Sequence, residues 1–356
     1  MHINLNELPE EYKKYTCRKT LFIFLGFILL ILVFIFSISI GAVRIPLLDV
    51  IKTLFFKTSS NKYNLIIWNI RLPQALTAVI AGIGLAVAGL VMQAILNNPL
   101  GSPLTLGFQH AAAFGAAFAV MILGTGVMQS TGNNAVNIVN HYITTFVAFC
   151  FCMLTAGIIL ITSKIKKTSP EVMVLAGVAF GTLFLAGTMF LQYFADDIQL
   201  AAMVFWTFGD VARATWKELM IILVTTVLSL FYFFYNIWNY NTMQAGDETA
   251  KSLGVNVEFI RLVSMIMATL VTSVIVSFLG IIGFVGLICP HMAKRVVGDD
   301  HRFLVPFTCI LGGLLLLSAD TVARTILLPH VLPVAILTSF LGAPVFIFLL
   351  IKGYKR

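Results

Sequence analysis

Apolar runs of about 20 residues recur along the whole chain, and a helix of this length crosses roughly 30 Å of hydrocarbon. Of the 356 residues, 59% are hydrophobic and 11% are charged, which excludes a soluble core as the main explanation of these runs. We therefore predict an all-α polytopic membrane protein with about ten transmembrane helices. The expected spans are 20–42, 75–96, 104–123, 141–162, 171–194, 218–236, 260–279, 282–293, 303–324 and 331–351.

The first of these runs, Leu21–Ala42, is predicted to be a span and not a secretory signal peptide. It stays uncharged for too long, and no small-residue cleavage site follows it. The polar residues 1–19 are expected to lie along the cytoplasmic surface, so that residues 20–356 form a single transmembrane domain. The five cysteines have neither metal-site nor disulfide spacing, and we interpret them as bystanders.

Positive charges are unevenly distributed between the two sides of the predicted bundle. With both termini in the cytoplasm, 15 lysines and arginines lie inside and 8 lie outside, which agrees with the positive-inside rule. Five of the outside charges lie between Arg44 and Arg71, against a single acid, Asp49. Such a basic outer surface can steer an acidic partner towards the membrane, although an ordinary solvated loop has the same composition.

Asp320 and Arg324 stand four residues apart inside the ninth expected span. This spacing places both side chains on one helical face, where each offsets the cost of removing the other from water. A charged pair in an apolar segment is expensive to keep, so this intramembrane pair is a candidate for function. Ion-coupled transport would favour several acids within the spans, and Asp320 is nearly alone there.

The second expected span combines small residues at helical spacing with one amide. Gly82, Ala86 and Gly89 form a stripe that lets another helix approach closely, as helices do in membranes. Gln93 lies in the same apolar span and needs a hydrogen-bonding partner. It would either bond to a neighbouring helix or border a hydrated path.

A polar stretch on the predicted cytoplasmic side, residues 244–258, contains the pattern of a short amphipathic helix. Residues 246–249 read G-D-E-T, which is typical of a helix start because acids in the first turn complement the helix dipole. Ala250, Leu253 and Val257 would then share one face. Taken alone, this helix would be an interfacial helix that lies on lipid. The chain has no G-x-x-x-x-G-K-[ST] motif, so an ATP-driven process would need a nucleotide site on another polypeptide.

Several blocks of sequence stand in a characteristic order between Arg71 and Phe346. The first blocks are R-L-P from Arg71, G-x-x-L-A-x-x-G-x-x-x-Q ending at Gln93, and N-P-L-x-x-P-x-x-L-G over residues 98–107. A-x-x-L-G-V begins at Ala250. The last quarter contributes G-F-V-G-L-I-x-P-H, D-H-R, A-D-T-V-A-R and G-A-P-V-F in that order. Together these blocks resemble FecCD-type permeases, the membrane subunits of type II ABC importers for iron-siderophore, haem and cobalamin.

The resemblance implies the permease fold of that family, acting as a dimer, with an A-x-x-L-G-V helix that sits in a groove of the ATPase subunit. The matching ATPase-coupling residues are Glu248, Ala250, Leu253, Gly254 and Val255. In the family, arginines dock to glutamates of a substrate-binding protein, and the matching positions are Arg71 and Arg324. Two features depart from the family: Gln74 replaces the second arginine of R-L-P-R, and residues 331–335 lack the acid of E-L-P-V-G.

Weaker candidates for the pathway or its gates lie elsewhere in the spans and loops. Gln109 and His110 open the third expected span, where the resembled family usually has small or hydroxylated residues. The histidine would contact the cargo or bond to another helix. Thr168 and Ser169 lie in a short cytoplasmic loop that narrows the pathway in that family, although a routine basic loop looks the same. Gln93 completes this group.

The predicted function is that of a permease that translocates an iron-siderophore complex by ATP-driven alternating access in a prokaryotic cytoplasmic membrane. Cobalamin, haem or molybdate are alternative cargoes, and an ion-coupled secondary transporter is the more distant alternative. The expected partners are two ABC ATPase subunits that hold ATP and Mg, a periplasmic or lipid-anchored binding protein, a second permease chain, identical or paralogous, and membrane lipid. We expect no catalytic residue, metal site or cofactor in this chain, and no nucleic-acid partner.

Overall fold

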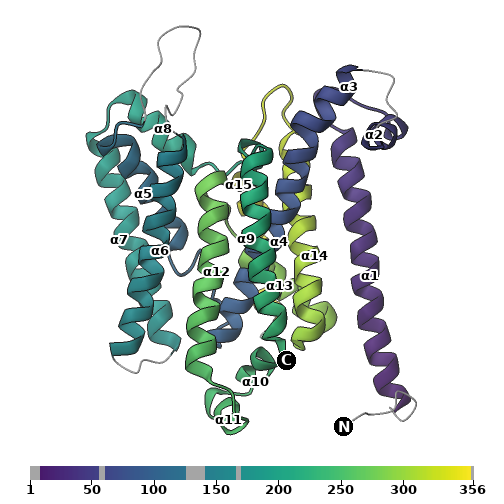
Figure 1. Cartoon of the computed structure of the whole chain (residues 1–356), viewed down its shortest axis with the longest axis vertical. Helices are drawn as coiled ribbons and strands as arrows, with labels where there is room; N and C mark the ends of the chain where they lie inside the picture. The colour runs from purple at the N-terminus through teal and green to yellow at the C-terminus, as the bar shows by residue number, and fades with distance from the viewer. Residues whose placement is uncertain (1–8, 56–60, 126–140, 166–169, 354–356) are drawn as a thin grey trace.

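The computed structural model describes residues 9–55, 61–125, 141–165 and 170–353, and within these ranges the chain forms helices and no strands. Figure 1 shows long helices running side by side, with short elements at both ends. The upper end in that view carries α2 (Leu47–Leu54), α3 (Asn61–Ile66) and α8 (Asp197–Thr207), and the lower end carries α10 (Ile237–Gln244) and α11 (Asp247–Ser252).

Ten helices of the described chain correspond to the ten expected spans, and the predicted all-α polytopic fold is confirmed. Seven of them are long and apolar enough to cross a membrane. These are α1 (Glu10–Ser39), α4 (Leu72–Ile95) with the turns before it, α6 (His141–Ile165), α7 (Pro170–Phe194), α9 (Trp216–Tyr235), α12 (Val257–Leu279) and α14 (His301–Ala323). The other three are α5 (Phe108–Ile122), α13 (Val285–Val297) and α15 (Val334–Gly353).

α5 and α13 are too short to cross a bilayer alone, because their 15 and 13 residues rise only about 22 and 20 Å. Each follows an irregular segment, residues 96–107 before α5 and residues 280–284 before α13. The backbone turns sharply there: φ is 75° at Gly107, 84° at Gly280 and 65° at Phe284. Irregular backbone at membrane depth is tolerated only where protein buries it or where it lines a cavity. The third and eighth spans therefore begin as helices later than the sequence predicted.

α4 is the central helix of the bundle, and α9, α12, α13 and α14 pack around it. A Cβ added to Gly82 would lie 2.2 Å from the carbonyl oxygen of Gly312 in α14, and one added to Gly89 would lie 1.7 Å from that of Gly286 in α13. The predicted small-residue stripe therefore packs backbone against backbone. Pro290 assists at the second contact, because it lacks the N–H that would otherwise bond the Gly286 carbonyl four residues earlier.

α1 lies at the periphery of the bundle, beside α14, and exposes most of its surface (Figure 1). Its most apolar window is 11% buried, against 78% for the helix that includes α4. Residues 10–19 continue α1 as helix, and the placement of the segment 1–19 on the cytoplasmic side stays a prediction. Within it, Lys19 is buried and donates a hydrogen bond to the Tyr15 hydroxyl.

Candidate functional site

The short helix α11 projects from the lower end of the bundle (Figure 1). It follows Gly246, where φ is 105°, and the chain leaves it at Gly254, where φ is 85°. Ala250 is fully buried against the bundle, whereas Leu253 keeps 66% of its surface exposed. A Cβ on Gly254 would meet nothing within 4 Å. An exposed leucine beside open space forms a corner that can enter a groove on another protein.

The five residues predicted to couple to an ATPase lie on two sides of this element. The exposed ones are Glu248, Leu253 and Gly254, whereas Val255 is half-buried and Ala250 is buried. The sequence predicted that Ala250, Leu253 and Val257 share one face. In the structure Ala250 and Val257 face the bundle and Leu253 points away from it, so that prediction was wrong for Leu253. The exposed residues can touch a partner, and Ala250 seats the helix.

Arg261, near the start of α12, joins α11 to the rest of the bundle. Its Nη2 lies 2.8 Å from each carboxylate oxygen of Asp247, the first residue of α11. Its Nε donates to the carbonyl oxygen of Ile95, the last residue of α4, at 2.7 Å. The last carbonyls of a helix have no partner within it, so Arg261 caps α4 while it holds α11. One guanidinium therefore connects the exposed helix to the central one.

The D-H-R motif forms a second polar junction at the lower end. Asp300 caps α14 by accepting a hydrogen bond from the backbone N–H of Arg302 at 3.0 Å, and its carboxylate lies 2.6 Å from Arg302 Nη2. Asn241 of α10 donates to Asp300 at 3.1 Å, and the Tyr12 hydroxyl of α1 lies 3.4 Å from Arg302. Partial burial alone would raise the pKa of Asp300, but these bonds outweigh it and hold the pKa below its ordinary value.

Arg71, predicted to dock a binding protein, is turned into the bundle at the upper end. Its side chain is held by carbonyl oxygens at and just after the end of α1: Nη1 donates to Ile38 at 2.7 Å and to Ser39 at 3.1 Å, and Nη2 donates to Val43. Arg71 is 5% exposed. Its visible role is to cap the end of α1, and in this conformation it offers a partner little surface.

Arg324, the other predicted docking residue, is engaged in the same region. Its Nε lies 3.0 Å from Asp320 Oδ2, and its Nη2 donates to the hydroxyl of Ser37 in α1 at 2.8 Å. Asp320 is 2% exposed and accepts a further bond from the Gln74 amide of α4 at 2.8 Å. The ion pair is thus part of a buried cluster that connects α1, α4 and α14. Gln74, at the position of a family arginine, completes that cluster.

We expect Asp320→Asn to lower the thermal stability of the purified chain. The substitution leaves the Arg324 guanidinium buried without a counter-charge, and breaking a buried pair in this way costs about 3–5 kcal/mol. Replacing both charges, as Asp320→Leu with Arg324→Met, should recover most of that loss because no unpaired charge stays buried. Thermal unfolding in detergent, followed by tryptophan fluorescence, measures both. Equal midpoints for Asp320→Asn and the wild type would show that the pair contributes nothing.

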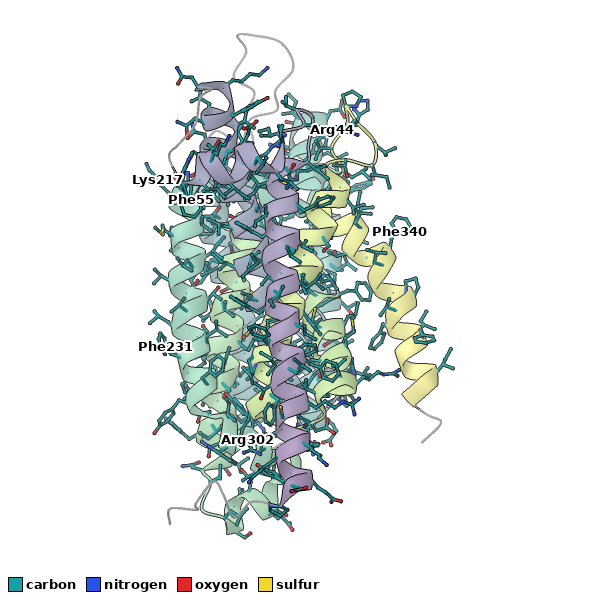
Figure 2. All side chains as sticks on the ribbon, turned by 90° about the vertical axis from the view of Figure 1, so that its right-hand side faces the viewer. Arg44, Phe55, Lys217, Phe231, Arg302 and Phe340 are labelled. Carbon is teal, nitrogen blue, oxygen red and sulfur yellow. The ribbon has the colours of Figure 1, made fainter. Side chains whose placement is uncertain are left out.

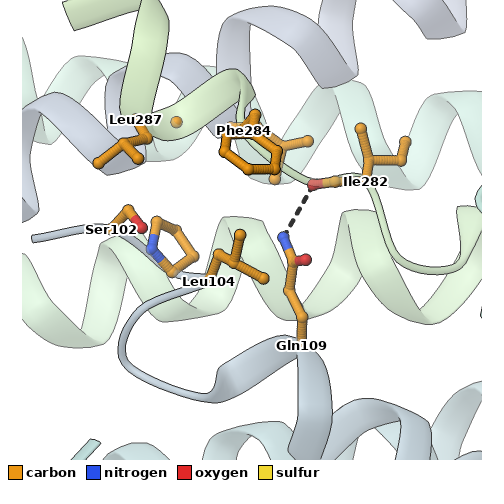
Figure 3. A pocket seen from close by; sticks show the side chains of 9 residues that line it. Ser102, Leu104, Gln109, Ile282, Phe284 and Leu287 are labelled. Atoms are coloured by element: carbon orange, nitrogen blue, oxygen red, sulfur yellow. Dashed lines mark hydrogen bonds between the residues drawn. The ribbon is translucent and has the colours of Figure 1, made fainter. Parts of the chain in front are cut away.

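The two irregular segments together line one small cavity (Figure 3). Nε2 of Gln109, the second residue of α5, donates to the carbonyl oxygen of Ile282 at 2.9 Å. Ser102 and Phe284 line the same cavity, whose volume of about 10 Å³ admits one water at most. Gln109 therefore satisfies a carbonyl that lies outside any helix. It also joins the start of α5 to the irregular segment that follows α12.

His110, the next residue, faces a different space. It lines an open cavity of about 140 Å³ together with Leu104, Thr105 and Gly181. One of its two expected roles was a hydrogen bond to another helix. Among the described residues the imidazole makes no hydrogen bond, so this role is not seen. The remaining role, contact with something that passes through the cavity, stays a prediction.

Gln93 is 3% exposed, and neither atom of its amide has a partner within the described chain. A buried amide without a partner costs on the order of 1–3 kcal/mol, which favours the hydrated alternative over a bond to a neighbouring helix. Thr168 and Ser169 lie outside the described residues.

Arg261 and Asn241 are among the site residues that the sequence did not single out. Arg261 entered only as one of the cytoplasmic positive charges, and Asn241 did not enter at all. The one available signal was an acid at 247 and a base at 261 on either side of a short connection. Such a pair suggests a contact across the loop, but it gives no indication that the same arginine reaches Ile95.

Comparisons with known proteins match nearly the whole chain. The model of the FecCD transport family matches residues 29–352. A Methanocaldococcus jannaschii protein described as an ABC transporter permease is 52% identical over 98% of this chain and 99% of its own length. The hemin transport system permease protein of Yersinia pestis is 34% identical over 93% and 96%. A solved structure described as an inward-facing conformation of a metal-chelate type ABC transporter aligns with a TM-score of 0.80 and 28% identity, over 93% and 98% of the two chains.

Proposed function

This chain belongs to the FecCD transport family of ABC importer permeases, and we propose that it carries an iron-siderophore complex across a prokaryotic cytoplasmic membrane. Both termini would be cytoplasmic, as the distribution of positive charge favours. Two separate ATPase subunits would drive alternating access. The observation that carries this mechanism is the exposed corner of Glu248, Leu253 and Gly254, which Arg261 connects to α4.

The coupling route begins where the ATPase would hold α11. Movement of α11 would act on Arg261 through Asp247, and Arg261 bonds directly to the last residue of α4. The irregular segment 96–107 follows at once and leads to Gln109, whose amide holds the carbonyl of Ile282. A displacement at the lower end would therefore reach the centre of the bundle along one continuous set of contacts.

The choice of cargo rests on the relatives, which carry several. The hemin permease is 34% identical to this chain, an iron(3+)-hydroxamate import permease of Bacillus subtilis 31%, and a molybdate import permease of Haemophilus influenzae 30%. These values are too close to separate the cargoes. Two Fe(3+)-citrate import permeases and a siderophore transport permease of Bacillus subtilis, 30–32% identical, join the hydroxamate permease, which supports an iron-siderophore complex as first choice, with haem, cobalamin and molybdate as alternatives.

The proposed assembly needs a second permease chain. Figure 2 shows α15 leaning away from the bundle, and Phe340 on it is 74% exposed. The cavities at Gln109 and His110, of about 10 and 140 Å³, are each too small for a chelate, so the pathway would run between two chains. A binding protein would dock at the upper end, and docking by Arg71 or Arg324 would require these side chains to turn out of their present contacts.

An ion-coupled secondary transporter is the alternative from another class. It would need a carboxylate in the spans that is able to hold a cation or a proton. Asp320 is already occupied by Arg324 and Gln74, which makes it a poor site for a coupling ion. The ABC importer mechanism is therefore preferred.

Uptake by the complex in proteoliposomes tests the proposal. We expect uptake of ferric hydroxamate to require ATP, a binding protein and an ABC ATPase copurified with this chain. Gly254→Trp should abolish uptake, because the indole would occupy the open space that the ATPase fills. Gly254→Ala shares the strain at φ 85° without the bulk and is the matched control. Uptake driven by an ion gradient without ATP would overturn the importer mechanism, whereas ATP-dependent uptake of hemin or molybdate alone would change only the cargo.

A further inference from the structure

The helix α2 at the upper end exposes an apolar face that the proposed function does not use. Leu47, Leu48, Ile51 and Phe55 are 49%, 71%, 41% and 72% exposed. At about 100° per residue these side chains occupy a single arc of the helix. Four large apolar side chains on little more than two turns are far more than a solvated helix would carry by chance.

The remaining surface of α2 is divided between protein and water. Val50 and Thr53, on the side opposite the apolar arc, are fully buried against the rest of the chain. Asp49 and the exposed Lys52 lie between the two. The helix therefore has a face for the protein, a face for water and a third face that is apolar and uncovered, which is the pattern of a helix at a membrane surface.

The position of α2 agrees with this pattern. In Figure 1 it appears end-on beside the upper end of α1, so its axis lies across that of the spans. Trp68 Nε1 donates to the carbonyl oxygen of Thr53 at 3.4 Å, and Trp216 Nε1 donates to that of Trp68 at 3.0 Å. The two indoles stack with centroids 6.5 Å apart. Tryptophans concentrate at the level of lipid headgroups, which places α2 at that level.

The neighbouring surface fits a lipid bilayer in both polarity and charge. α1 packs against α2, and near its upper end Phe36 is 52% exposed. Arg44, Lys52 and Lys62 are exposed, and no ion pair involves them in the part of the chain that the structure describes. Basic side chains beside a membrane-seated helix attract anionic headgroups.

We propose that α2 is an interfacial anchor: its apolar arc lies among the outer ends of the acyl chains, and Arg44, Lys52 and Lys62 bind anionic lipid headgroups. This assignment goes beyond the transport function. It also gives the basic segment a different partner from the acidic protein that the sequence suggested. Anchored in this way, the end of α1 and the start of α4 are held at a fixed depth by the membrane as well as by Arg71.

Site-specific fluorescence in vesicles tests the apolar part of the proposal. The five native cysteines are first replaced, and an environment-sensitive label is attached to Leu48→Cys or Phe55→Cys, with Asn61→Cys as the exposed control. In phosphatidylcholine vesicles we expect labels at 48 and 55 to be blue-shifted and quenched by nitroxide-bearing lipid, several-fold more strongly than the label at 61. The proposal would be overturned if aqueous iodide quenched the labels at 48 and 55 as fully as the label at 61, and if only an added protein shielded them.

The charged part is tested with lipid composition. Thermal unfolding of the full chain is compared in phosphatidylcholine nanodiscs with and without phosphatidylglycerol. We expect the anionic lipid to raise the unfolding midpoint of the wild type. The triple variant Arg44→Glu, Lys52→Glu and Lys62→Glu should lose that shift. A triple variant that keeps the full shift would show that these three side chains do not bind the headgroups.

Discussion

Replacing Arg261 by alanine is expected to separate ATP hydrolysis from transport. The substitution removes the two contacts to Asp247 and the cap on Ile95, so α11 can still meet an ATPase but no longer acts on α4. Hydrogen bonds of charged groups contribute about 1.5–3 kcal/mol each, and about 1.4 kcal/mol corresponds to a tenfold change in an equilibrium. We therefore expect uptake per ATP hydrolysed to fall by roughly tenfold or more, with hydrolysis retained. Parallel assays of phosphate release and uptake in proteoliposomes measure this ratio.

The chain provides two controls for this experiment. Lys251 and Glu258 form another pair in the same connection, at 3.3 Å, but both side chains are largely exposed. Because such surface pairs contribute little, Lys251→Ala should leave the ratio unchanged. Exchanging the charges, as Asp247→Arg with Arg261→Asp, restores the ion pair but not the cap on Ile95. Full recovery by the exchange would mean that the ion pair alone transmits the movement, and that the contact with α4 is dispensable.

Gly89→Ala is expected to prevent most molecules of the protein from folding correctly. The new methyl group would lie 1.7 Å from the Gly286 carbonyl oxygen and 2.6 Å from the Gly286 Cα. Both are backbone atoms, so no side-chain rotation can relieve the clash, and α4 and α13 would have to separate. Overpacking costs about 1–3 kcal/mol even where side chains can adjust, and here the loss should be at the upper end or beyond. The yield of monodisperse protein and its unfolding midpoint measure the effect.

Gly157→Ala is the matched control for that substitution. Gly157 also lies inside a spanning helix, α6, but a Cβ there would meet nothing within 4 Å. The same change should be neutral or slightly stabilising, because alanine restricts the unfolded chain and favours helix. If Gly89→Ala folds as well as Gly157→Ala, α4 and α13 are not packed backbone to backbone as the structure has them.

The sequence predicts the number and order of the spanning helices because each needs a long apolar run, and such runs are visible without any knowledge of contacts. The starts of α5 and α13 were missed for the same reason. Residues 104–107 and 282–284 are apolar enough to continue a helix, and only the turns at Gly107 and Phe284 show that they do not. Hydropathy reports the depth of a residue in the membrane and not its backbone conformation.

In the candidate site, contacts between residues close in sequence could be predicted, and contacts between distant residues could not. The pair Asp320 and Arg324 is visible in the sequence because a helix brings residues four apart together. The bonds that complete their cluster come from Gln74 and Ser37, which lie 246 and 287 residues away from their partners. No local pattern encodes such contacts, and so Arg71 and Arg324 were assigned to an outside partner, whereas in the structure both side chains bond within the chain.

These separations have a consequence for how the protein is made. The bonds from Arg71 to the end of α1 join residues 28–33 apart, so α1 and α4 can pair soon after both are inserted. The bond from Gln74 to Asp320 must wait for 246 more residues, which takes roughly 12–50 s at a synthesis rate of about 5–20 residues per second. Throughout that interval the nascent chain holds a polar amide in the membrane without its final partner. The insertion machinery, or water beside it, must shield Gln74 until α14 arrives.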